Sequence, residues 1–391
     1  MPFEWAAREF EHFTQTHVSP SMAERVTEMA GAVHVANQTE EVSRIEKELP
    51  PAPEGPAKQF LSVDGAMVPL VGGEWAEVKT LVIGEVMPPV LVKGEPVVHT
   101  VKHSYFSRLT NAEAFRRLAL VETHRRGVET AQMVGAVTDG SEWIQAFVDF
   151  HRVNALRILD FPHAGEHLNG IGQAIFGEGS LQARSWLDGQ LHQLKHTGPT
   201  PVLAEARRLI SKYPNHLAAT HLAYLEKREA HMQYPAFLAT GWPIGDGAVE
   251  SANKLVVEKR LKGSGMHWAR SNVDPMLALR NIACNDRWEE AWPQIMMTLR
   301  LREQQRRVQR RQQRRAQSAE RESKAEAVAT TVDCRSAVLP TPLVDSIPPT
   351  PADAPKTKPT GPYRPPPDHP WRHMPIGRAR FKPPKPTDAK L

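Results

Sequence analysis

The sequence is poor in cysteine and has no long apolar run, and each absence excludes a class of protein. Its 391 residues include two cysteines, Cys284 and Cys334, which is too few for a disulfide framework or a cysteine-based zinc site and fits a reducing cytoplasm. No apolar run reaches the roughly 18 residues that a membrane span needs. The first residues, MPFEWAAREFEHF, lack the basic and then apolar order of a secretion signal. We therefore expect a cytoplasmic protein without a membrane partner.

The overall charge is only mildly basic, but it is unevenly distributed. The net charge is +5 and the isoelectric point is about 9.2, which favours an acidic partner such as nucleic acid. Residues 300–321 contain nine arginines interleaved with glutamines, which could extend a helix, grip phosphates or keep a tail soluble. Beyond Leu339 lie 16 of the 34 prolines. We therefore expect residues 303–391 to form a basic and then proline-rich, disordered tail.

The first 50 residues have the apolar spacing of helices. An apolar stripe runs from Phe3 to Phe13, and Ser19 or Ser21 could cap a second helix. A third helix could follow a turn within residues 31–37, which would give a helix-turn-helix that reads DNA; an ordinary helical packing arm is the alternative. The run PPAPEGP at residues 50–56 predicts a linker to the rest of the chain.

Strand and helix patterns alternate over residues 57–161. Strands at 59–70, 75–86 and 96–105 return as hairpins, and a helix at 110–126 then begins with the capping-box pair Thr110 and Glu113. A helix at 142–151 separates two buried strands, at 132–140 and 155–161. Three antiparallel strands followed by parallel β-α-β steps are typical of a ribonuclease-H-like mixed sheet. We expect an α/β catalytic domain at 57–302 with a helical insertion at about 168–240.

Three carboxylates stand where such a fold could gather them. Asp64 lies on the first predicted strand, Asp139 ends the fourth, and Glu250 stands in the first turn of a helix that follows the glycine turn 245–247. Ligands of open α/β sheets bind at the carboxyl ends of strands. Three carboxylates that meet there could hold Mg²⁺ (or Mn²⁺) together with phosphate oxygens for an in-line displacement. The structural alternative is that Asp64-Gly65 and Asp139-Gly140 are ordinary turns and that Glu250 complements the helix dipole.

Cations follow Glu250 on the same predicted helix, which ends at Gly263 and Gly265. We expect these cations to contact DNA phosphates, with a solvated face as the alternative. They are Lys254, Lys259, Arg260 and Lys262, and we expect Arg270, beyond the two glycines, to act with them. The helical period predicts one buried face, formed by Val249, Ala252, Leu255 and Val256.

A second polar group follows the fifth predicted strand. Asp160 ends that strand, and His163 follows three residues later. The pair could cap the next helix, or it could support a metal site or the scissile DNA. Asp160 is also the alternative to Asp139 as the second metal ligand. His163 and His167 have the spacing of a zinc-binding pair, but no third ligand is evident in the sequence.

Several blocks of the sequence, taken together, resemble a known family. They are VDGAMVPL with GEWAEVK, AVTDGSEWI, LDFPHAGEHL, GWPIGDGAVESANKLVVEKRLKGSGMHWA and ALRNIACNDRWEEAW. In this order they are similar to the bacterial insertion-sequence DDE transposases of the Kra type, within the Mutator-like superfamily, over about residues 59–292. The resemblance implies a ribonuclease-H-like core in which Asp64, Asp139 and Glu250 are the catalytic and metal-binding acids. Asp160 and His163 match an accessory motif of the superfamily, whereas Asp246 replaces an expected serine.

The function that the resemblance implies is metal-dependent DNA cleavage and strand transfer of an insertion sequence. Mg²⁺ or Mn²⁺ would be the cofactor, and transposon ends and target DNA the partners. We expect a homo-oligomer that assembles on DNA and associates with the nucleoid. Three alternatives stay open. One is a catalytically inactive or truncated DNA-binding derivative, since family members carry a longer N-terminal region than the 50 residues before the linker. The others are a nuclease of the same fold and an interaction protein that uses the proline-rich tail.

Overall fold

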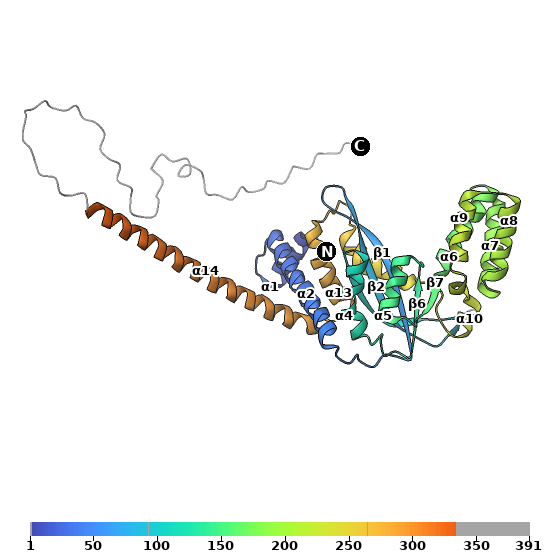
Figure 1. Cartoon of the computed structure of the whole chain (residues 1–391), viewed down its shortest axis with the longest axis horizontal. Helices are drawn as coiled ribbons and strands as arrows, with labels where there is room; N and C mark the ends of the chain where they lie inside the picture. Colours follow the sequence, from blue (N-terminus) through green and yellow to red (C-terminus); the bar gives the residue numbers. More distant parts are fainter. Residues whose placement is uncertain (1, 93, 264, 334–391) are drawn as a thin grey trace, which may run out of the picture. The chain divides into compact units, whose positions relative to one another are not determined.

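The chain divides into two units, of which the first contains the sheet. A computed structural model describes residues 2–92, 94–263 and 265–333 (Figure 1). The first unit covers Met1–Ala316 and the second Gln317–Leu391. Residues 317–333 of the second unit are described, and they are helical. The predicted proline-rich segment lies outside the described residues.

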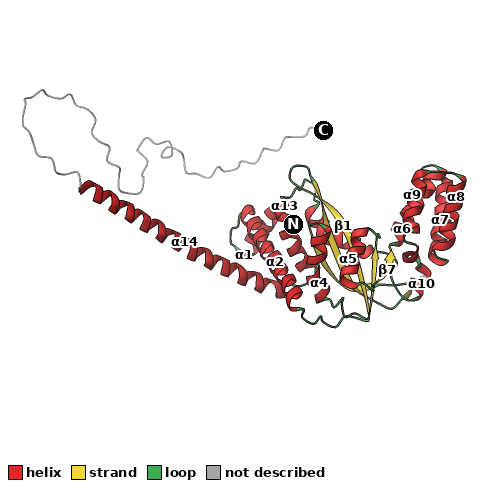
Figure 2. Cartoon of the chain, viewed as in Figure 1, coloured by secondary structure: helices red, strands yellow, loops and turns green. Residues whose placement is uncertain are grey.

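A five-stranded mixed sheet forms the centre of the first unit (Figure 2). Its order is β5-β2-β1-β6-β7. β2 runs antiparallel to β1 and β5, whereas β1, β6 and β7 are parallel. The strands are β1 (Lys58–Pro69), β2 (Trp75–Val86), β5 (Thr100–Arg108), β6 (Met133–Thr138) and β7 (Leu156–Leu159), and a small hairpin of β3 (Val90–Val92) and β4 (Glu95–Val97) lies between β2 and β5. The mixed α/β sheet expected from the sequence is confirmed.

Apolar side chains cover both faces of the sheet, because successive residues of a strand point to opposite sides. Phe60 of β1 packs with Val137 and with the helices that follow β7. Its neighbour Leu61 packs on the other face with Phe106 and with helices α3 and α5. Asp64, four residues after Phe60, therefore belongs to the face that the later helices cover. The helices of the Leu61 face are α3 (Ala112–Leu118), α4 (Leu120–Arg125) and α5 (Glu142–Arg152).

Helices fill the chain between β7 and the segment that carries Glu250. The apolar interior of this helical segment is continuous with the Phe60 face of the sheet. The helices expected within residues 168–240 are present, and the first of them already begins at Phe161. They are α6 (Phe161–Phe176), α7 (Leu181–His196), α8 (Pro199–Lys212), α9 (His216–Glu226), a short 3₁₀ turn (Glu229–Met232) and α10 (Tyr234–Ala239).

The N-terminal region contains two helices, α1 (Phe3–Thr14) and α2 (Pro20–Glu48). Ser19 caps α2 as expected, since its hydroxyl accepts the Met22 N–H at 3.2 Å. The turn predicted within residues 31–37 is wrong, because α2 runs through it, and the helix-turn-helix prediction is wrong with it. Gly31 is instead a packing residue: a Cβ there would lie 2.2 Å from the carbonyl oxygen of Pro275 in α13 (Arg270–Cys284). The N-terminal helices therefore match the alternative of a helical packing arm, in which α2 packs against α13.

Two further boundaries differ from the sequence prediction. Asn111 caps α3 in place of Thr110, by accepting the Ala114 N–H at 2.8 Å. The helices after the glycine turn are separated near Asp286, which has a φ of +54°, into α13 and α14 (Trp288–Asp333). The disordered-tail prediction is wrong for residues 303–333, because arginine, glutamine and glutamate are good helix formers.

Among the described residues, none of the helices is both long and apolar enough to cross a bilayer.

The helix after the glycine turn changes its winding part-way along. α11 (Gly247–Ala252) passes into a π-helical segment (Asn253–Glu258) and then into α12 (Lys259–Leu261). The buried row Val249, Asn253, Val257 and Leu261 has a spacing of four residues. An α-helix would rotate such a row by about 40° at each step, whereas the wider π turn keeps it against β1. The predicted buried face is therefore wrong at Leu255, which is 37% exposed.

Candidate active site

Three aspartates lie level with one another where the parallel strands β6 and β7 end: Asp64 lies within β1, and Asp139 and Asp160 directly follow β6 and β7. The register of β1 with β6 pairs residue 58 with 133, an offset of 75, which is also the separation of Asp64 from Asp139. The register of β6 with β7 pairs residue 138 with 159, an offset of 21, which is also the separation of Asp139 from Asp160. Neighbouring strands lie about 4.8 Å apart. The sheet therefore gathers the three aspartates at one edge, where ligands of such sheets bind.

α11 and the π-helical segment bring Glu250 and Asn253 to the same edge. The Asn253 Nδ2 donates a hydrogen bond of 2.8 Å to the Asp64 Oδ2. Asn253 is 6% exposed, and its Oδ1 is a buried acceptor without a hydrogen-bond partner in the described part of the chain. Glu250 is exposed, and its Oε2 lies 3.7 Å from the Lys254 Nζ. The sequence analysis did not predict this contact between Asn253 and Asp64.

The carboxyl groups at this edge influence one another's ionisation. Burial raises the pKa of Asp64, and the charges of Asp139 and Glu250 raise it further. Burial and the charge of Asp160 raise the pKa of Asp246 to about 8, and Asp64 and Glu250 add to the effect. Carboxyl groups repel one another in this way only when they are close together. Asp64, Asp139, Asp160, Asp246 and Glu250 therefore form one cluster, the acidic site, and a bound cation would relieve its repulsion.

Asp160 connects the end of β7 to the glycine turn before α11. Its Oδ2 accepts the His163 N–H at 2.8 Å, and its Oδ1 accepts the Asp246 N–H at 2.9 Å. The adjacent Phe161 N–H donates to the Ile244 carbonyl at 2.9 Å. Burial raises the pKa of Asp160, while the two backbone donors act in the opposite direction. The helix cap predicted for Asp160 is confirmed, and the same side chain also fixes the start of α11.

Two residues at the end of α9 hold the turn that carries Asp139. The Tyr224 hydroxyl donates to the Asp139 carbonyl. The Arg228 Nε and Nη2 donate to the Gly140 carbonyl at 3.0 and 2.8 Å, and the guanidinium lies 3.6 Å from the centre of the Tyr224 ring. Gly140 has a φ of +74°, and a Cβ there would lie 2.6 Å from the Arg228 Nε, so this turn requires glycine. The sequence analysis missed Tyr224 and Arg228, because no local pattern links α9 to a turn 85 residues away.

His163 and His167 pack against Tyr224. The ring centres of His163 and Tyr224 lie 5.8 Å apart, and His167 stacks on Tyr224 at 3.8 Å. The Nδ1 atoms of His167 and His221 lie 3.1 Å apart. Burial lowers the pKa of His167 to about 4, and the neighbouring histidines contribute to the shift. His167 is therefore neutral at neutral pH, and both histidine rings pack beside the acidic site.

The predicted phosphate-binding cations differ in their surroundings. Arg260 is 9% exposed, and its guanidinium lies 4.7 Å from the ring centre of Phe3 and 5.0 Å from that of Trp268. Arg260 thus stabilises the packing of α1 and has no exposed face for DNA, contrary to the prediction. Lys262 pairs with Glu258 and Arg270 with Glu74, each at 2.7 Å. The exposed members of the predicted set are Lys254, Lys259, Lys262 and Arg270.

The donor set of the acidic site suits Mg²⁺, although the side chains do not enclose an ion as they stand. Asp64, Asp139 and Glu250 offer the carboxylate oxygens that Mg²⁺ prefers, and the unpartnered Asn253 Oδ1 lies beside Asp64. Within residues 2–92, 94–263 and 265–333, no group of three His, Cys, Asp or Glu side chains is arranged to hold a metal ion.

No protein-family model matches this chain, and no curated protein matches it either. The family resemblance of the sequence motifs therefore stays a prediction. The function has to be inferred from the acidic site.

Proposed function

We propose that the protein is a metal-dependent DNA phosphoryl transferase of the DDE transposase type, which cleaves DNA at the ends of an insertion sequence and joins those ends to target DNA. The observation that carries the proposal is the shared register of Asp64, Asp139 and Asp160 at the carboxyl edge of the sheet. Glu250 reaches that edge from a segment more than 100 residues away, and its charge acts on Asp64. Acids from separate segments that converge in this way are what a shared divalent cation requires.

The strand order supports a ribonuclease-H-like identity for the core. Numbered by their order in the chain, the strands of the sheet run 3-2-1-4-5, and the second is antiparallel to its neighbours. Three antiparallel strands followed by parallel β-α-β steps are typical of that fold. Asp64 lies on the central strand, Asp139 follows the fourth, and Glu250 follows a helical segment.

The residues of the site divide into those that would hold the metal and those that position them. Mg²⁺ or Mn²⁺ held by Asp64, Asp139 and Glu250 would activate the attacking hydroxyl and stabilise the leaving oxygen of an in-line displacement. Asn253 orients Asp64 by donating to its Oδ2. Asp160 already accepts a backbone N–H on each oxygen, which favours Asp139 as the second ligand.

Positioning and charge neutralisation would complete the chemistry. Tyr224 and Arg228 hold the backbone of the Asp139 turn, so that the second acid is fixed before the substrate binds. Exposed cations near Glu250 would neutralise backbone phosphates, which gives affinity without sequence information. These are Lys254, Lys259, Lys262 and Arg270.

The test is metal-dependent nicking of a supercoiled plasmid. Asp64→Asn, Asp139→Asn and Glu250→Gln should each abolish nicking and leave DNA binding intact, because they remove one metal-binding oxygen without changing size. Asp188→Asn, an exposed site on α7, is the matched control and should behave as the unaltered protein. Retained nicking by Asp139→Asn, with loss by Asp160→Asn, would transfer the role of second ligand to Asp160.

A DNA-binding protein without phosphoryl transfer activity is the second candidate. Two observations favour it. Asp246 adds a further carboxyl group to the acidic site, and no three His, Cys, Asp or Glu side chains of the described residues are arranged to hold a metal ion. Tight DNA binding without nicking in Mg²⁺ or Mn²⁺ would select this candidate. Nicking without strand transfer from pre-cut ends would instead indicate a nuclease of the same fold.

A further inference from the structure

The exposed segment 300–316 of α14 has a larger net positive charge than the whole chain. Residues 300–316 contain eight arginines, one glutamate and no lysine, which gives this segment a net charge of +7. The whole chain has a net charge of +5, so the remaining residues together are slightly acidic. The one acid of the segment, Glu303, pairs with Arg307 at 2.9 Å.

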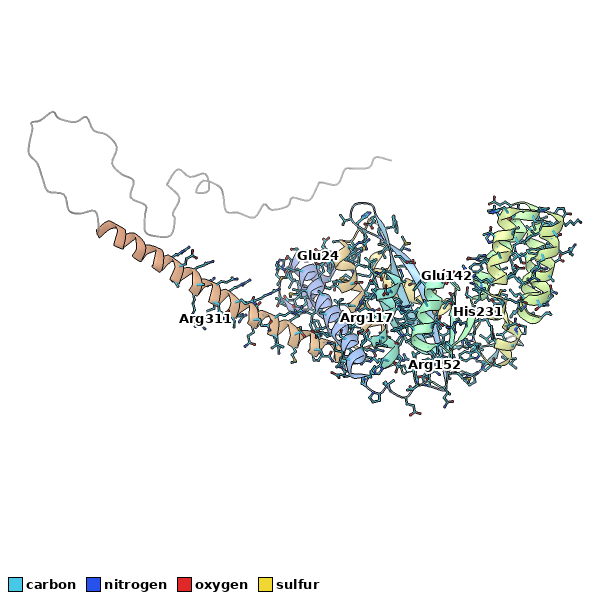
Figure 3. All side chains as sticks on the ribbon, viewed as in Figure 1. Glu24, Arg117, Glu142, Arg152, His231 and Arg311 are labelled. Carbon is cyan, nitrogen blue, oxygen red and sulfur yellow. The ribbon has the colours of Figure 1, made fainter. Side chains whose placement is uncertain are left out.

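The base of α14 is packed, whereas residues 300–316 are exposed. Ile295 is fully buried in a cluster with Val33 of α2 and Ile282 of α13. From Arg300 to Ala316 every residue is exposed. The side chains project from the helix as extended sticks, as Arg311 does in Figure 3.

The arginines lie in rows that repel one another. Two rows with a spacing of four residues run side by side: Arg306, Arg310 and Arg314, and Arg307, Arg311 and Arg315. Like charges at this spacing face each other on a helix, and each pair destabilises it by about 0.2–0.5 kcal/mol. A polyanion that lies along the helix would remove this repulsion.

The composition and geometry of the segment fit a nucleic acid better than a membrane. Arginine binds phosphate through two parallel hydrogen bonds, which lysine cannot do. A membrane-surface helix needs an apolar face, whereas Leu301 and Val308 are the large apolar residues within 300–316. The segment is about 24 Å long and its arginines cover about 220° of the circumference. A helix in the major groove has phosphates on both sides, and such an arc of arginines could reach both walls.

We propose that residues 300–316 of α14 form a binding surface for double-stranded DNA, in which the arginine rows contact the phosphate backbone. The choice of DNA as the duplex rests on the proposed function, but the binding itself does not depend on the acidic site. This surface supplies general affinity for the duplex rather than recognition of a sequence.

The test measures binding of the full-length protein to a fluorescent duplex of about 30 base pairs over about 50–200 mM salt, without divalent cations. The arginine-to-glutamine variant keeps helix propensity and removes four charges, at Arg310, Arg311, Arg314 and Arg315. The matched control removes four exposed cations from α7 and α8, at Arg184, Arg207, Arg208 and Lys212.

If four phosphate contacts are lost, the slope of log affinity against log salt should become less steep by about 3.6, and the affinity at about 100 mM salt should fall about 10³-fold. The control should stay within about tenfold of the unaltered protein. A variant with lysine in place of the same four arginines keeps the charges and should retain most of the salt dependence. This comparison separates the loss of charge from a loss of affinity caused by unfolding of the helix.

Equal affinity of the four-site variant and the unaltered protein would overturn the proposal. So would binding to phosphatidylserine vesicles or to polyglutamate as tight as to DNA, because either would assign the surface to another partner. If DNA is bound through α14 but never nicked, this inference holds and the proposed enzymatic function fails.

Discussion

The proton held between Asp160 and Asp246 should make stability depend on pH in a defined direction. Burial and the charge of Asp160 raise the pKa of Asp246 to about 8, whereas an aspartate in an unfolded chain has a pKa of about 3.9. Between these values the folded protein keeps a proton that the unfolded chain has released. The contribution of Asp246 to the free energy of unfolding is therefore fully present below about pH 4 and is lost as the pH rises toward about 8.

The magnitude follows from the width of that window. Each pH unit changes the free energy of unfolding by up to about 1.4 kcal/mol, so a window of about four units sets an upper limit of about 6 kcal/mol. Asp246 is partly exposed, and solvent screening reduces the effect, so we expect about 3 kcal/mol. Asp246→Asn removes the titration and keeps a group that can donate to Asp160.

The assay is urea denaturation of both proteins with chelated metal at about pH 5 and about pH 8.5. This range covers about three of the four pH units, so the stability difference between Asp246→Asn and the unaltered protein should grow in favour of the variant by about 2 kcal/mol. Asp188→Asn should show a difference that does not change with pH. If the curves for Asp246→Asn and the unaltered protein run parallel, Asp246 is not protonated in the folded state and the reasoning fails.

Two further predictions concern contacts away from the metal-binding oxygens. Arg287→Ala leaves the carboxylate of Glu122, whose side chain is 4% exposed, without its two donors at 2.7 and 2.8 Å; we expect a loss of about 3–5 kcal/mol in urea denaturation. Arg117→Ala breaks an exposed pair and should cost less than about 1 kcal/mol, so equal losses would contradict this account. Tyr224→Phe keeps the ring but removes the hydrogen bond to the Asp139 carbonyl, which should cost about 1 kcal/mol of stability. It should also slow plasmid nicking more than it weakens DNA binding, and an unchanged rate at limiting Mg²⁺ would argue against a positioning role.

The sheet and the candidate acids could be predicted from the sequence, because both leave local signals. Alternating apolar residues mark β1, and an apolar run ends at Asp139, so Asp64 could be placed on a strand and Asp139 at the end of another without knowledge of their partners. The order of strands then follows from the preference for hairpins and for parallel β-α-β steps. What the sequence could not supply was the pairing offset that sets Asp64 level with Asp139.

The features that were mispredicted depend on packing between distant segments. Gly31 looks like a helix breaker in isolation, but it allows α2 to approach Pro275 of α13 closely. Leu255 fits the buried face of a regular helix, yet the π-helical segment rotates it outward and buries Val257 instead. Arg260 has the sequence context of a phosphate contact, but the rings of Phe3 and Trp268 cover its guanidinium. Each error arose where tertiary contacts overrode a local pattern.

The hydrogen bonds from α9 to the Asp139–Gly140 turn have a consequence for how activity could be controlled. Deleting residues 161–239 would leave the strands whole but would strip two carbonyl groups of their donors from Tyr224 and Arg228. A protein or nucleic acid that docks on these helices and tilts α9 would loosen the same turn without entering the acidic site. An inhibitor or an assembly partner that binds the helices of residues 161–239 could thus change the position of Asp139 from a distance.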